Sequence, residues 1–159
     1  MSKLIQARNL TKTYTSGGTV VRAVDHVTFD VAAGEYVAIV GPSGAGKSTL
    51  LHMFGGLDTP SEGSIEFNER DVYKMRDNAI SLWRNQHIGF VFQFYHLIDE
   101  FTVLENVLLP ARIGKKKYAF KRAEELLEYL GIAERKNFFP IYFYRYYLIL
   151  GYISEIGFP

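Results

Sequence analysis

Hydrophobic and polar positions alternate near the start of the chain, which predicts β-structure there. Residues 4–10 form a short apolar-rich stretch, and residues 27–31 alternate strictly between apolar and polar side chains. This period of two is typical of strands with one buried face. Residues 64–67 predict a further strand, and a turn is expected at Asn68-Glu69, where an Asn-Gly pair would turn more easily.

Two longer apolar runs and two helical patterns follow. The run Tyr36–Val40 (YVAIV) suits a strand buried on both faces, and His87–Gln93 (HIGFVFQ) predicts another strand. Residues 48–54 have helical character and stop at Gly55-Gly56. Residues 116–130 predict a second helix, which Gly131 ends. Its apolar side chains, at positions 119, 123, 126, 127 and 130, lie on one face. Strands and helices interleave, so the pattern predicts an α/β fold.

Composition narrows the class of protein without naming it. The chain has 159 residues, enough for one domain with a core, and is 48% hydrophobic and 22% charged. The net charge is +1, which does not indicate a nucleic-acid-binding protein, so we expect no nucleic-acid partner. The absence of cysteine excludes a disulfide scaffold or a thiolate metal site and fits a reducing cytosol.

One motif carries recognisable chemistry. Residues 41–49 read GPSGAGKST, a full match to the phosphate-loop pattern G-x-x-x-x-G-K-[ST]. Small residues let the backbone N–H groups surround a phosphate, and the helix that follows adds its positive N-terminal dipole. Lys47 would reach the β- and γ-phosphates, and Ser48 would offer a hydroxyl to Mg²⁺. The alternative is a glycine-rich turn that binds nothing, but the predicted strand before it and helix after it favour phosphate binding.

The loop alone does not identify the nucleotide. A GTPase would need an Asn-Lys-x-Asp motif, and the nearest stretch, residues 68–71 (NERD), lacks the lysine. An aromatic ring can instead hold adenine by stacking, and Tyr14 follows the first predicted strand. Taken by itself, Tyr14 reads as an ordinary surface aromatic residue.

Three stretches together resemble a known family. They are LTKTY, GEYVAIVGPSGAGKSTLLHMFGGLDTPSEGSIEFN and IGFVFQFYHLIDEFTVLENVLLP. They are similar to the nucleotide-binding subunit of ABC transporters, and most similar to the branch of lipoprotein-releasing systems and macrolide exporters. The resemblance runs over residues 3–140. It implies the N-terminal part of an ABC-type phosphate-loop ATPase fold, with an antiparallel β-subdomain and a phosphate-loop core but without the second half.

The resemblance also implies roles for individual residues. Tyr14 would stack on the adenine of ATP, Gln93 would join Ser48 as a ligand of Mg²⁺, and Lys47 would be catalytic. The stretch Phe94 to Asn106 would receive the coupling helix of a transmembrane permease. The Walker A motif would hold the phosphates with Gly41, Pro42, Ser43, Gly44, Ala45, Gly46, Lys47, Ser48 and Thr49.

In the family, two such subunits enclose two ATP molecules head to tail, and ATP binding and hydrolysis drive transport. The resemblance thus implies an export ATPase that moves a lipoprotein, peptide or drug. It would sit on the cytoplasmic face of the cell membrane with its permease and a second nucleotide-binding subunit.

The last residues depart from the family pattern. Residues 141–159 contain seven aromatic and two charged residues, against 17 aromatic residues in the preceding 140. A membrane-spanning helix needs about 20 consecutive apolar residues. These 19 residues include Arg145, Gly151, Ser154 and Glu155, so a membrane-spanning helix is disfavoured. We therefore expect residues 1–140 to be a partial nucleotide-binding domain and residues 141–159 an aberrant tail, as from a shifted reading frame.

Residues 1–159 show no family signature motif, Walker B carboxylate or switch histidine, so the chain alone is expected to be inactive. The alternative function is a non-catalytic nucleotide-binding remnant.

Overall fold

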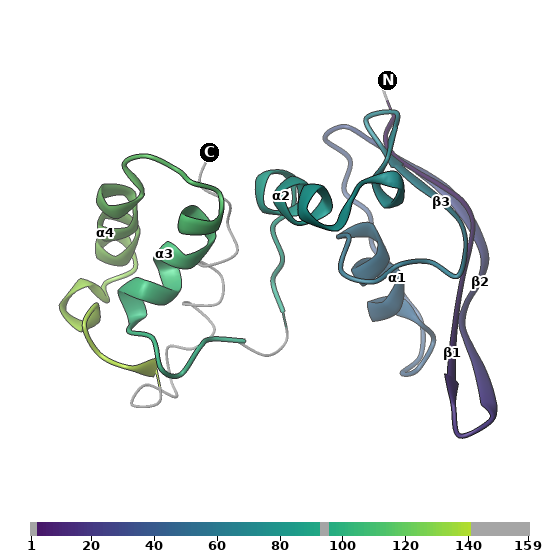
Figure 1. Ribbon diagram of the computed structural model, residues 1–159, viewed down its shortest axis with the longest axis horizontal. Helices are drawn as coiled ribbons and strands as arrows, with labels where there is room; N and C mark the ends of the chain where they lie inside the picture. The colour runs from purple at the N-terminus through teal and green to yellow at the C-terminus, as the bar shows by residue number, and fades with distance from the viewer. Residues whose placement is uncertain (1–2, 93–95, 141–159) are drawn as a thin grey trace. The chain divides into compact units, whose positions relative to one another are not determined.

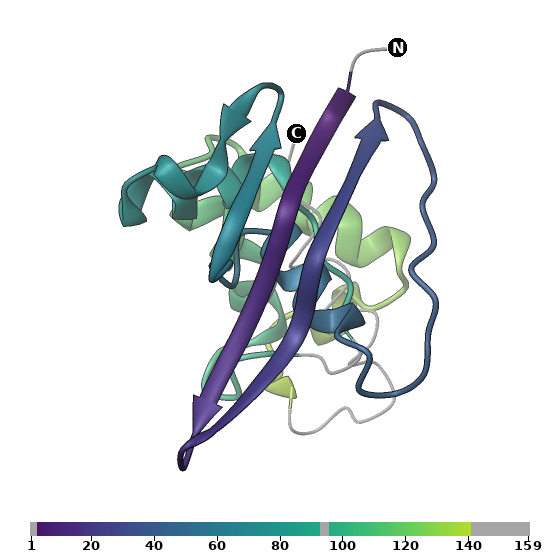
Figure 2. The same ribbon diagram turned by 90° about the vertical axis from the view of Figure 1, so that its right-hand side faces the viewer.

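The structure is a computed structural model, and it describes residues 3–92 and 96–140. Its first part is built by strand pairing along both edges of one long strand. Strand β1 (Lys3–Ser16) pairs antiparallel with β2 (Thr19–Ala32) on one edge and with β3 (Glu62–Phe67) on the other. A short β4 (Arg70–Asp71) completes a sheet of order β2-β1-β3-β4 (Figure 2). The strands predicted at residues 4–10, 27–31 and 64–67 are confirmed as parts of β1, β2 and β3.

The chain divides into two compact units, Met1–Ser81 and Leu82–Pro159 (Figure 1). In the first unit, helix α1 (Lys47–Phe54) packs on one face of the sheet and buries Leu50 and Met53. These two side chains form one core with residues from the sheet, namely Ala7, Leu10, Val24 and Ile65. Because strand residues alternate between faces, the side chains of the opposite face do not enter this core.

The turn between β3 and β4 has the conformation expected of a tight hairpin. Asn68 and Glu69 both have positive φ, 49° and 63°. A two-residue turn with both central residues in the left-handed region twists with its strands, which makes it the favoured hairpin connection. The turn predicted at these positions is confirmed. Glu69 adopts a conformation that glycine would adopt at lower cost.

The second unit has a helical core. Helices α3 (Val103–Ile113) and α4 (Ala119–Tyr129) pack together and share the buried side chains of Val107 and Leu127. The apolar face predicted for residues 116–130 is confirmed, because Ala123 and Leu127 are buried in this core. Gly131 follows α4 with a φ of 69°, the left-handed conformation that ends many helices.

Three further elements complete the described chain. They are helix α2 (Asp77–His87) and two short 3₁₀ turns, η1 (Val72–Lys74) and η2 (Ala133–Arg135). Among the helices in residues 3–92 and 96–140, none is long and apolar enough to cross a membrane.

Two predicted strands are wrong. Residues 35–42 and 88–92 have no regular secondary structure, and His87 ends a helix. In the first stretch Tyr36 is fully exposed and Val40 is 87% exposed. A run that is apolar on both faces needs neighbours along its edges and on both faces. Within the described residues, no strand pairs with either stretch, so the apolar pattern alone did not make a strand.

A single asparagine organises the loop before α3. Thr102 caps this helix and forms a capping box with Glu105. Asn106 is only 3% exposed and makes four hydrogen bonds to the loop. Its Oδ1 accepts from the backbone N–H of Ile98, and its Nδ2 donates to the backbone carbonyls of Ile98, Phe101 and Thr102. The side chain therefore pairs with partly buried loop backbone groups that would otherwise lack these partners.

We expect Asn106→Ala to lower the free energy of unfolding by about 2–4 kcal/mol, because it removes the side-chain partner of several partly buried backbone groups. Urea denaturation followed by far-UV circular dichroism measures the loss. Asn137→Ala, at an exposed position of the same unit, is the matched control and should change stability by less than about 0.5 kcal/mol. Equal effects of the two substitutions would show that the Asn106 network adds no stability.

Candidate functional site

The glycine-rich loop of residues 41–46 leads directly into α1. Leu50 N–H donates to the carbonyl of Gly46 at 2.9 Å, the first hydrogen bond of the helix. The backbone N–H groups of residues 47–49 precede that bond and have no partner within the helix. Lys47 Nζ reaches back over the loop and donates to the carbonyls of Gly41 at 2.9 Å and Pro42 at 2.6 Å. The loop thus presents backbone donors and one ammonium group at the same place.

A close approach to β2 holds the end of this loop. Gly46 has a φ of 80°, and a Cβ built on it would lie 2.0 Å from the carbonyl oxygen of Ala23. Gly44 has the same φ, but a Cβ there would meet nothing within 4 Å. Position 46 therefore excludes a side chain by contact as well as by conformation. A cavity of about 290 Å³ beside this contact is bordered by Val24 and Lys47.

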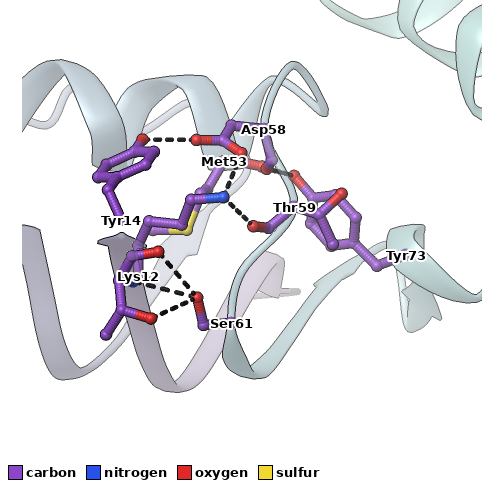
Figure 3. Close-up of polar contacts among 8 residues, drawn as sticks. Lys12, Tyr14, Met53, Asp58, Thr59, Ser61 and Tyr73 are labelled. Carbon is purple, nitrogen blue, oxygen red and sulfur yellow. Dashed lines mark hydrogen bonds and ion pairs between the residues drawn. The ribbon is translucent and has the colours of Figure 1, made fainter. Parts of the chain in front are cut away.

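Tyr14, near the end of β1, is held by a polar network (Figure 3). Its hydroxyl donates to Oδ2 of Asp58 at 2.6 Å. Lys12 forms an ion pair with the other carboxylate oxygen, Oδ1, and donates to the carbonyl of Thr59 at 2.7 Å. Lys12 and Tyr14 are two residues apart on one strand, so their side chains leave the same face of the sheet.

The network shifts the titration of both of its acidic groups. The pKa of the Tyr14 hydroxyl is raised, first by its hydrogen bond to Asp58 and then by burial. Burial raises the pKa of Asp58, but the hydrogen bonds from Lys12 and Tyr14 outweigh it and hold that pKa below its ordinary value. At neutral pH Asp58 is therefore a carboxylate and Tyr14 a neutral donor.

The structure brings together some of the predicted site residues. The side chain of Thr49 lowers the pKa of Tyr14, which opposes the effect of Asp58. Tyr14 and the phosphate loop are thus neighbours within one unit. Ser48, at the start of α1, is exposed.

The structure describes only part of the remaining predicted residues. Gln93, Phe94 and Tyr95 lie outside the described residues. Of the stretch predicted to receive a permease, residues 96–106 are described and belong to the second unit. The described part of the chain holds no group of three or more histidine or acidic residues that could bind a metal ion.

Sequence reasoning missed Asp58 and Lys12. Lys12 could have been noticed, because its spacing from Tyr14 places both on one face of a strand. Asp58 lies 44 residues from Tyr14 and follows a glycine-rich turn that looks unremarkable. Only the sheet, by pairing β1 with β3, brings the intervening segment back beside Tyr14.

Residues 41–46 form a loop of small residues that leads into helix α1, and Lys47 donates hydrogen bonds to carbonyls of this loop. These features define a phosphate-loop protein. Residues 24–143 match the model of the ABC transporter family, and the chain belongs to that family. This confirms the resemblance on which the predicted fold rests.

The chain is similar to lipoprotein-releasing system ATP-binding proteins called LolD. It is 48% identical to that of Cytophaga hutchinsonii over 142 residues, which cover 88% of this chain and 63% of the relative. The identity to LolD of Geobacter metallireducens is also 48%, with the same coverage. For LolD of Idiomarina loihiensis it is 42%, over 86% of this chain and 61% of the relative. The chain thus spans less than two thirds of the length of these relatives.

Solved structures of ABC cassettes have the same fold. The dimeric structure of MJ0796, a bacterial ABC transporter cassette, has a TM-score of 0.87 at 32% identity and covers 96% of this chain. The match covers 69% of the cassette. A post-hydrolysis state of the MJ0796 cassette, bound to ADP and Pi, has a TM-score of 0.84 at 33% identity, over 95% of this chain and 68% of the cassette. The ABC ATPase fold, represented by its N-terminal portion, is confirmed.

We expect Gly46→Ala to disrupt the loop far more than Gly44→Ala. Both substitutions force alanine into the left-handed region, which costs about 1–2 kcal/mol, but only the first also drives a Cβ against the backbone of β2. Thermal unfolding of the two variants measures the difference, and Gly46→Ala should have the lower midpoint. Equal midpoints would contradict the close seating of the loop on β2.

Proposed function

We propose that this chain is the nucleotide-binding part of an ATP-binding subunit of an ABC-type export system. The observation that carries the proposal is the grouping of Lys47, the N-terminus of α1 and Tyr14 within one unit. Similarity to LolD proteins favours lipoprotein release over peptide or drug export as the process served.

Phosphate binding follows from the loop geometry. The free N–H groups at the start of α1 and the helix dipole both favour an anion there. Lys47 Nζ, which bonds to two loop carbonyls, would exchange these neutral acceptors for the charged oxygens of the β- and γ-phosphates. The other residues of the loop that we propose as phosphate contacts are Gly41, Pro42, Ser43, Gly44, Ala45, Gly46, Ser48 and Thr49.

The residues at the loop fit Mg²⁺ only in part. Ser48 places an exposed hydroxyl one residue beyond Lys47, a position suited to a metal that also binds the phosphates. Gln93 is proposed as the second protein ligand by resemblance alone. When bound, Mg²⁺ would neutralise phosphate charge. The chain's own part is to hold the phosphates through the loop and Lys47.

Tyr14 is proposed to stack on adenine. Its side chain is 43% exposed, so one part of the ring remains open while the hydroxyl is held. Stacking on an aromatic face requires this combination of access and fixed orientation.

The wider function is proposed from the relatives. The dimeric MJ0796 cassette supports assembly with a second nucleotide-binding subunit, and the LolD relatives support work in a lipoprotein-releasing system with a membrane permease. We propose that residues near Phe94 to Asn106 contact that permease and that the subunit is peripheral on the cytoplasmic face of the membrane. We further propose, from the change in composition, that the family-like part of the sequence extends to about Pro140; the family match itself extends to residue 143.

We expect isothermal titration to detect Mg-ATP binding to the 159-residue chain and Lys47→Ala to weaken it by about tenfold or more. The loss follows because the substitution removes the charge that pairs with phosphate, and tenfold corresponds to about 1.4 kcal/mol. Lys117→Ala is the control, an exposed lysine of the other unit, and should leave affinity unchanged. No binding heat for the unaltered chain, or equal losses in both variants, would refute phosphate binding at this loop.

A further inference from the structure

Asp58 is held through its backbone as well as through its carboxylate. Its backbone carbonyl accepts from the hydroxyl of Tyr73 at 2.6 Å, and its backbone N–H donates to the carbonyl of His52 at 3.3 Å. Tyr73 also bonds to the carbonyl of Met53, so the segment after α1 is tied down (Figure 3). The carboxylate thus extends toward Tyr14 from a rigid base.

The two oxygens of this carboxylate have separate partners. Oδ2 accepts from the Tyr14 hydroxyl, and Oδ1 pairs with Lys12. The side chains of Lys12 and Asp58 are only 13% and 26% exposed, so water screens this pair less than it screens an open surface pair. Lys12 Nζ also lies 5.1 Å from the centroid of the Tyr14 ring, over one face. Lys12 therefore lies over one face of the ring, and the 43% exposure of Tyr14 leaves part of this residue accessible to a ligand.

We propose that Asp58 is a positioning residue for the nucleotide base. It holds the Tyr14 ring by its hydroxyl in a single orientation, with Lys12 closing one ring face and leaving the other for adenine. This inference rests on the proposed function, because it assigns Tyr14 a base to stack on. Asp58 itself touches no part of the nucleotide.

The proposal predicts that loss of the Asp58 contact weakens binding of the base and leaves binding of the phosphates unchanged. A ring that is already immobilised does not lose its side-chain entropy when the base binds. Releasing the ring should therefore lower the affinity for ATP by about threefold to tenfold. Tripolyphosphate has no base, so its affinity should stay the same. A purely structural role for Asp58 would instead alter both ligands together.

Titration calorimetry of the 159-residue chain with Mg-ATP and with Mg-tripolyphosphate tests this. The variants are Tyr14→Phe, which removes only the hydroxyl, Asp58→Ala, and the two combined. Tyr36→Phe removes the same atom from a fully exposed tyrosine and is the matched control. The expected result is an ATP affinity lowered about threefold to tenfold in each single variant, with tripolyphosphate unchanged. The double variant should be no more than about twofold weaker than either single variant, because both break one interaction.

Two results would overturn the inference. The first is an unchanged ratio of the ATP and tripolyphosphate affinities in both single variants, whether or not both affinities fall in parallel. The second is full additivity of the two substitutions in the double variant. Each of these leaves nucleotide binding by the phosphate loop intact. If the unaltered chain bound neither ligand, the proposed function would fail, and the positioning role of Asp58 with it.

Discussion

Hydrogen bonding along both edges of β1 is the constraint on which the first unit depends. β1 runs from Lys3 to Ser16 and pairs with β2 and β3 at once. The pairing with β2 fixes Arg22 and Val24, which flank Ala23, and the end of the phosphate loop is seated against Ala23 at Gly46. The pairing with β3 returns the chain to β1 and so carries Asp58 to Tyr14. The phosphate end and the base end of the candidate site are thus positioned by the same strand.

The site uses charge in two different ways. Lys47 lies among neutral carbonyl acceptors, which a phosphate can replace with a stronger partner. Lys12 already has a carboxylate partner in Asp58, and this pair holds a neighbouring ring instead of a ligand. Under the proposed function, the two lysines would therefore serve different parts of one nucleotide. A phosphate-binding lysine must be able to change partners, whereas a supporting lysine must keep its partner.

The sequence predicted what depends on local pattern. The alternation in residues 27–31, the turn at Asn68-Glu69 and the helix before Gly131 all have local causes, and each is confirmed. The Walker A motif is also local, because backbone shape follows from its glycines. The strands predicted at Tyr36–Val40 and His87–Gln93 were wrong, since a strand needs partners that its own residues do not contain. The role of Asp58 depends on sheet pairing across 44 residues, which no local pattern reveals.

The central claim is that one unit of this chain carries the contacts for both phosphate and base. Hydrogen–deuterium exchange of the 159-residue chain, with and without saturating Mg-ATP, tests it most directly. Backbone amides that donate to phosphate exchange slowly while the ligand is bound. The account predicts that added Mg-ATP slows exchange at residues 43–50 and around Tyr14, with little change in α3 and α4. Unchanged exchange at the loop, or protection confined to the second unit, would contradict it.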